Sequence, residues 1–169
     1  MKYTHRPLQR GYANQILTID LTNRSVATPA LLPELRAYFL GGRALGLYLL
    51  HKRLTGTLSP ADPSNPLIFA PGPLAGIPQF PGTSKCMAVS LSPLTGIPGV
   101  SNFGGHFGAY LKYAGFDALE IVGQAAADLM IVIDGFQQEV SLCEMPEIAE
   151  VFDLENAIVK RFVDAGRDK

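Results

Sequence analysis

The feature that most constrains the fold is a pair of glycine dipeptides, Gly41-Gly42 and Gly104-Gly105, each followed by apolar residues at helical spacing. The spacing predicts helices over residues 44–54 and 106–114, and Gly115 is the expected C-terminal cap of the second helix. The two glycine-helix segments resemble one another and begin 63 residues apart. The sequence therefore predicts an internal duplication, with two related sheet-plus-helix halves facing one another.

Short apolar or alternating runs bounded by Gly, Pro, Asn or Asp predict the strands. They predict an α+β fold with two β-sheets and short helices. The predicted strands are residues 15–21, 25–28, 67–70, 87–91, 118–122, 129–133 and 139–144, with an ordered loop or irregular strand at 96–102. Further helices are expected at 32–40 and 154–165, the latter amphipathic with Leu154, Ile158, Phe162 and Val163 on one face.

Composition restricts the class of protein. With 169 residues and 47% hydrophobic side chains, a single domain over residues 1–169 is expected, with residues 1–10 as a disordered tail. The net charge of −1 and the scattered 14 Lys and Arg argue against a nucleic-acid partner. No apolar run is long enough for a membrane span and no secretory signal is present, so a cytoplasmic protein is expected.

A glycine pair before a helix lets the backbone approach a ligand and leaves N–H groups free at the positive end of the helix dipole. Two such starts could hold two anionic groups. The alternative is that these glycines only allow close packing of helix on sheet. The further glycine loops at Gly72, Gly76, Gly82, Gly96 and Gly99 favour a ligand surface. Neither pair matches a P-loop or a dinucleotide-binding fingerprint.

Several motifs in order resemble the N-terminal domain of the aldehyde:ferredoxin oxidoreductase family. The resemblance extends from about Gly11 to near the end of the chain. The motifs are 20–22 (DLT), 40–45 (LGGRAL), 72–76 (GPLAG), 92–96 (SPLTG), 101–108 (SNFGGHFG) and 111–117 (LKYAGFD).

The resemblance implies an oxidoreductase with a tungsten or molybdenum bis-pterin that oxidises aldehydes to carboxylic acids and passes electrons through a [4Fe–4S] cluster to ferredoxin. The two β-sheets would be the platform for the pterins. A magnesium ion would bridge the two pterin phosphates, with the backbone carbonyl of Asn102 as one of its ligands. Gly104 would approach a pterin with its backbone, and Gly105, Gly42 and Arg43 would contribute to the same cofactor site.

Lys85 stands where the family is expected to have a cofactor-binding arginine. Lysine keeps the charge but loses the planar fork, and a plain surface lysine is an equal alternative. Arg43 could instead lie on a solvated helix face, and His106 could be a packing residue. Cys86 is expected to be a small core residue, not a nucleophile.

The chain has 2 cysteines, too few for a [4Fe–4S] cluster, so the cluster and the substrate residues are expected in later domains or in a partner subunit. No catalytic residue is therefore expected here, and the chain alone is expected to be inactive. A non-catalytic scaffold or assembly subunit remains the alternative, which Lys85 favours. A generic phosphate-binding module is a third possibility.

Overall fold

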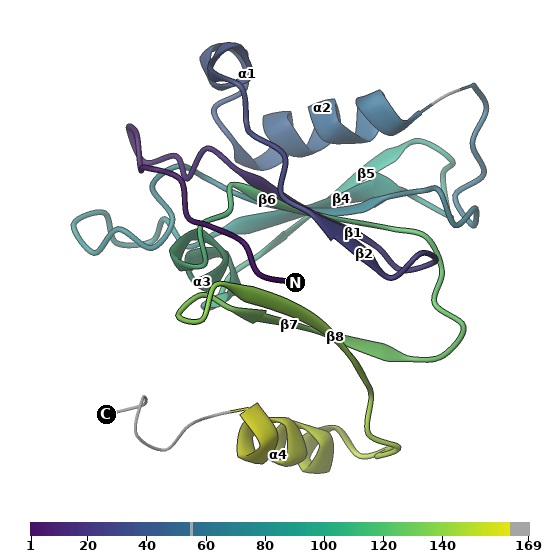
Figure 1. Cartoon of the computed structure of the whole chain (residues 1–169). Helices are drawn as coiled ribbons and strands as arrows, with labels where there is room; N and C mark the ends of the chain where they lie inside the picture. The colour runs from purple at the N-terminus through teal and green to yellow at the C-terminus, as the bar shows by residue number, and fades with distance from the viewer. Residues whose placement is uncertain (55, 163–169) are drawn as a thin grey trace.

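A six-stranded mixed sheet forms the centre of the molecule, with strand order β2-β1-β6-β3-β4-β5 (Figure 1). The structure, a computed structural model, describes residues 1–54 and 56–162. Strands β1 and β6 run parallel, and the other neighbouring strands are antiparallel. The strands are β1 Ile16–Asp20, β2 Ser25–Ala27, β3 Leu67–Pro71, β4 Cys86–Leu91, β5 Pro98–Phe103 and β6 Ala118–Val122.

A second sheet is the antiparallel hairpin of β7 (Leu129–Asp134) and β8 (Glu139–Glu144). The helices are α1 (Pro33–Tyr38), α2 (Gly42–Arg53), α3 (Phe107–Tyr113) and α4 (Val151–Phe162). Helix α2 covers one face of the large sheet, and α3 and the hairpin lie on the other face (Figure 1). The predicted α+β class with two sheets and short helices is confirmed.

The large sheet is apolar on both faces because both are covered. On the α2 side, Leu45, Leu49 and Leu50 pack on Ile68 and Val89 in one core cluster. The second cluster, on the opposite face, joins residues of β1 and β6 to α3 and to the hairpin. Its buried members are Tyr3, Leu17, Ile19, Leu111, Ala114, Phe116, Leu119 and Val140.

Both glycine-pair helices pack on the one large sheet, from opposite faces, so the repeat does not produce two separate sheet-plus-helix halves as expected. The pairs differ in local position. Gly41 is the N-cap of α2 and Gly42 its first residue, whereas His106 is the N-cap of α3. Gly115 caps α3 as predicted: its φ is +90°, its N–H donates to Lys112 O, and the Phe116 N–H donates to Leu111 O.

Two segments differ from expectation. Residues 98–103, expected to be irregular, form a regular strand at the sheet edge, where Pro98 needs no ladder hydrogen bond. The sequence predicts a disordered tail over residues 1–10, whereas the structure places residues 1–5 against the hairpin. Tyr3 is buried there, its N–H donates to Gln138 O and its hydroxyl donates to Ala114 O.

The last helix begins three residues earlier than predicted and has no fully buried residue. Val163 and the predicted extension to residue 165 lie outside the described residues. Within the described part of the chain, no helix is both long enough and apolar enough to span a bilayer.

Candidate cofactor site

Three strands place their ends together at one edge of the large sheet. Strand β3 ends at Pro71, β4 begins at Cys86 and β5 ends at Phe103, and Cys86 is the cross-strand partner of both of the other two. We call this edge, with the residues immediately beyond it, the glycine end. Antiparallel pairing of β3, β4 and β5 therefore brings three separate segments of the sequence to one place.

On the α2 face, the first helical residue lies above this edge. A Cβ added at Gly42 would lie 3.8 Å from Met87 Cγ, and Met87 is the cross-strand partner of Asn102. Directly opposed residues of an antiparallel pair share a face, so Asn102 lies on the α2 face beside Met87. Gly41 packs against the end of β3, where a Cβ would lie only 3.0 Å from Pro71 O.

Lys85 and Gly104 extend the same register by one step beyond the strands. A Cβ added at Gly104 would lie 3.6 Å from Lys85 Nζ, so the ammonium group lies over this glycine. Lys85 is exposed, and within the described residues its side chain makes no hydrogen bond or ion pair. A free cation beside open backbone suits an anionic ligand group.

The start of α2 adds to the positive character of this face. No side chain caps the helix, and its first turn holds no acidic residue. Arg43 is exposed and, within the described residues, unpaired. The helix dipole and Arg43 therefore favour an anion at this end of the helix.

On the opposite face, Gly105 and His106 lead into α3. A Cβ added at Gly105 would meet nothing within 4 Å, although its φ of +83° suits glycine. The His106 ring stacks on Tyr110 at 5.8 Å between centroids. His106 also lines a hollow of about 370 Å³ between α3 and residues 76–84.

The structure thus brings Gly42, Lys85, Asn102 and Gly104 together, with Arg43 next to Gly42 and Gly105 next to Gly104. The glycine loops are not all part of this site. Gly96 and Gly99 lie at the far ends of β4 and β5.

Two further glycines allow close packing of helix on sheet, which is the role that the alternative interpretation of the glycines predicts. A Cβ at Gly46 of α2 would lie 2.6 Å from Val89 Cγ2, and a Cβ at Gly108 of α3 would lie 3.3 Å from Cys86 Cβ. Each Gly-Gly pair is therefore followed by a packing glycine, and the two helices contact β4 from opposite faces.

In the described part of the chain, no group of three or more His, Cys, Asp or Glu residues lies close enough together to hold a metal ion. Cys86 is fully buried, and burial raises the pKa of its thiol to about 11, so its interpretation as a core residue is confirmed. What the glycine end offers is backbone, an amide side chain and free cations. This set fits a large cofactor with phosphate groups.

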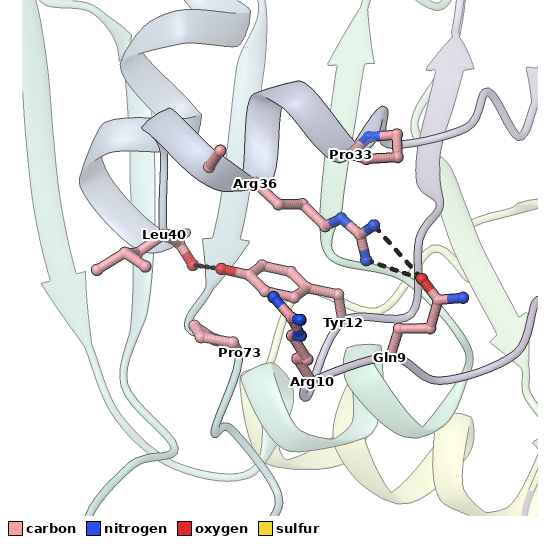
Figure 2. Close-up of a pocket in the computed structure, with 8 residues that line it drawn as sticks. Gln9, Arg10, Tyr12, Pro33, Arg36, Leu40 and Pro73 are labelled. Atoms are coloured by element: carbon pink, nitrogen blue, oxygen red, sulfur yellow. Dashed lines mark hydrogen bonds between the residues drawn. The ribbon is translucent and has the colours of Figure 1, made fainter.

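Sequence reasoning missed a hollow that the structure shows. A hollow of about 850 Å³ is lined by Arg10, Tyr12 and Arg36, together with Leu40 and Pro73 (Figure 2). None of the six predicted cofactor residues lines this hollow or the one beside α3. Arg10 and Arg36 are far apart in the sequence and belong to no motif, so no local signal could have joined them.

Comparison with known proteins agrees with the resemblance that the motifs indicate. Residues 16–167 match the description "Aldehyde ferredoxin oxidoreductase, N-terminal domain". A tungsten-containing aldehyde ferredoxin oxidoreductase of Pyrococcus horikoshii is 37% identical over 130 residues, or 77% of this chain and 21% of that protein. Its counterpart in Pyrococcus abyssi is 41% identical over 115 residues, or 68% of this chain and 19% of that protein.

Two other relatives have different names. An aliphatic sulfonate oxidoreductase, WOR-like subunit, of Pyrococcus furiosus is 35% identical over 127 residues, or 73% of this chain and 20% of that protein. A solved structure of the active site complex BamBC of benzoyl coenzyme A reductase, in complex with 1,5-dienoyl-CoA, is similar with a TM-score of 0.83 and 27% identity. That similarity covers 89% of this chain and 23% of the other.

The chain spans about a fifth of the length of these relatives. The family match covers most of the chain and agrees with the glycine motifs and with the fold. The chain belongs to the aldehyde ferredoxin oxidoreductase family, and the part of that family that it matches is the N-terminal domain.

Proposed function

We propose that this chain is the cofactor-holding part of a tungsten- or molybdenum-pterin oxidoreductase that oxidises aldehydes to carboxylic acids, with ferredoxin as electron acceptor. The observation that carries the proposal is the convergence of Gly42, Lys85, Asn102 and Gly104 at the glycine end of the sheet. The proposal also rests on the names of the relatives, which are tungsten-containing aldehyde ferredoxin oxidoreductases.

Each residue has a defined part in the proposal. Lys85 and Arg43 neutralise phosphate charge, and the free start of α2 adds its dipole. Gly42, Gly104 and Gly105 let a flat ligand approach the backbone, because they carry no side chain. Asn102 would offer its backbone carbonyl as a ligand to a magnesium ion.

When bound, the tungsten- or molybdenum-pterin supplies the two-electron redox chemistry, and this chain orients it without a catalytic side chain of its own. The residues that handle the substrate and the [4Fe–4S] cluster then belong to further domains or to a partner subunit. The chain alone is expected to be inactive. Because one relative is named for aliphatic sulfonate rather than aldehyde, the substrate class rests on those other parts.

The test uses a pair of glycine substitutions with opposite expected outcomes. Gly104 has no positive φ, and a Cβ there meets Lys85 only at ordinary contact distances of 3.6 and 3.9 Å. Gly104→Ala should therefore leave thermal stability unchanged but place a methyl group where the pterin should lie. Gly96 has a φ of +69° at the far end of the sheet, so Gly96→Ala should cost about 1–2 kcal/mol and leave cofactor content unchanged.

The measurement is tungsten, molybdenum and pterin content of the native protein and both variants, purified without oxygen, beside their melting temperatures. The proposal fails if the native protein holds neither metal nor pterin. It also fails if Gly104→Ala retains full cofactor content at full stability.

Lys85 separates the cofactor site from a scaffold that has lost it. Lys85→Ala should lower pterin content, and Lys85→Arg should maintain or raise it. Lys52→Ala is the matched control, since Lys52 is also an exposed lysine but lies in the last turn of α2. Absence of pterin from Lys85→Ala, Lys85→Arg and Lys52→Ala alike would instead support the scaffold. Equal, full pterin content in all three would refute the part given to Lys85.

A further inference from the structure

The hollow beside α1 has no part in the proposed function. Its volume of about 850 Å³ is within the range of small-molecule sites. It lies between α1 and residues 9–12. None of the residues proposed to hold the pterin lines it.

The hollow is positively charged. Its charged lining residues are Arg10 and Arg36, and none of the lining residues within 1–54 and 56–162 is a carboxylate. The Arg36 guanidinium donates only to neutral acceptors, Gln9 Oε1 at 3.4 Å and Asn14 Oδ1. Arg10 makes no side-chain hydrogen bond or ion pair with any described residue. No described carboxylate pairs with either arginine, so an anion entering the hollow meets both charges.

Of the two cationic groups, Arg36 is positioned before any ligand arrives. Arg36 lies over the Tyr12 ring at 5.5 Å from its centroid, and the Tyr12 hydroxyl donates to Leu40 O at 3.0 Å. In the view of Figure 2 the two guanidinium groups lie on opposite sides of that ring. The Lys112 ammonium is also near the ring, at 5.9 Å, but Asp117 pairs with it. Fixed donors lose little entropy on binding.

The remaining walls are apolar. Leu40 and Pro73 line the hollow together with the ring of Tyr12. A fully hydrated inorganic ion would gain nothing from these walls, whereas an organic anion would bury its apolar part against them. Arginine forks suit carboxylate and phosphate oxygens in particular.

From this geometry we propose that the hollow lined by Arg10, Tyr12 and Arg36 binds a small organic anion, one carrying a carboxylate or phosphate on an apolar body. The arginines hold the anionic group and the Tyr12, Leu40 and Pro73 surface holds the body. This site is separate from the proposed cofactor site, and its occupation requires no metal or pterin.

The test is calorimetric titration of the native protein with phenyl phosphate. Inorganic phosphate and phenol, which represent its anionic and apolar halves, are titrated separately. Phenyl phosphate should bind, and each half alone should bind at least tenfold more weakly. Binding should weaken with added salt, because the contact is ionic.

The decisive variant is Arg10→Gln. The Arg10 side chain has no hydrogen-bonded partner among the described residues, so its replacement should leave the melting temperature unchanged. It should lower the affinity for phenyl phosphate about tenfold. Arg24→Gln is the matched control, because Arg24 is also an exposed arginine with a positive φ, of 48°, but lies in the β1–β2 turn.

The proposal is overturned if phenyl phosphate does not bind, or if Arg10→Gln and Arg24→Gln bind it equally. It is also overturned if inorganic phosphate binds as tightly as phenyl phosphate. Metal and pterin content is measured on the same samples. A normal cofactor content without phenyl phosphate binding would refute this site and leave the proposed function intact.

Discussion

Replacing Asp117 with asparagine should destabilise the protein strongly, because Asp117 is half of a buried ion pair. The side chains of Lys112 and Asp117 are 5% and 4% exposed. Asp117 also accepts the N–H groups of Ala13 and Asn14 at 2.9 and 2.7 Å, and Lys112 Nζ donates to Gly11 O at 2.7 Å. The pair therefore ties the segment before β1 to the end of α3.

The magnitude follows from what each substitution leaves behind. Asp117→Asn leaves the Lys112 ammonium buried without a counter-charge, which costs roughly 3–5 kcal/mol. Lys112→Met leaves Asp117 with its two backbone N–H donors, so it should cost less. The double variant leaves no buried charge, and its loss should be smaller than the sum of the two single losses.

The assay is hydrogen exchange of residues 11–17 in the native protein, combined with urea unfolding of each variant. Glu139→Gln is the control, because the Lys2–Glu139 pair is exposed and should contribute little. A loss below about 1 kcal/mol for Asp117→Asn would refute the reasoning. Strictly additive losses in the double variant would refute it too.

Three further outcomes follow from burial and packing. Gly46→Ala should lose about 1–3 kcal/mol in urea unfolding, because its Cβ would lie 2.6 Å from Val89 Cγ2, and Val89→Ala should restore part of this loss. Iodoacetamide at pH 8 should modify Cys143 before Cys86, as read by peptide mass spectrometry, because Cys86 is fully buried; equal rates in the folded protein would contradict this. Burial raises the pKa of Cys86 to about 11, so its thiol ionises more readily in the unfolded chain. The free energy of unfolding should therefore fall between about pH 9 and 11 by on the order of 2 kcal/mol. Urea unfolding across this pH range should show a smaller fall for Cys86→Ala.

Local chemistry made most elements predictable. Alternating apolar residues predicted β1, a short apolar run predicted β7, and the Gly115 cap ended α3 where expected, because these signals depend on neighbours in the sequence. Strand β5 was harder to predict from the sequence. Pro98 and Gly99 disfavour a strand by propensity, and only pairing with β4 over six residues overrides this.

The tail and the arginine hollow could not be predicted in the same way. Tyr3 becomes ordered because the hairpin, more than a hundred residues away in the chain, offers it Gln138 O and a place in the second core. Arg10 and Arg36 meet only because α1 folds back over the segment before β1. Contacts of this kind leave no periodicity in the sequence.

For this protein the sequence alone determined most of the secondary elements, the two glycine-helix segments and the family, since each depends on local residue order. The tertiary structure decided what the glycines do. Strand pairing brought Asn102 and Gly104 to one edge, where the packing of α2 places Gly42, and left Gly96 at the other edge. Gly46 and Gly108 pack on β4 from opposite faces. The physical reason is that a glycine's role depends on what approaches its Cα, and long-range strand pairing chooses that neighbour.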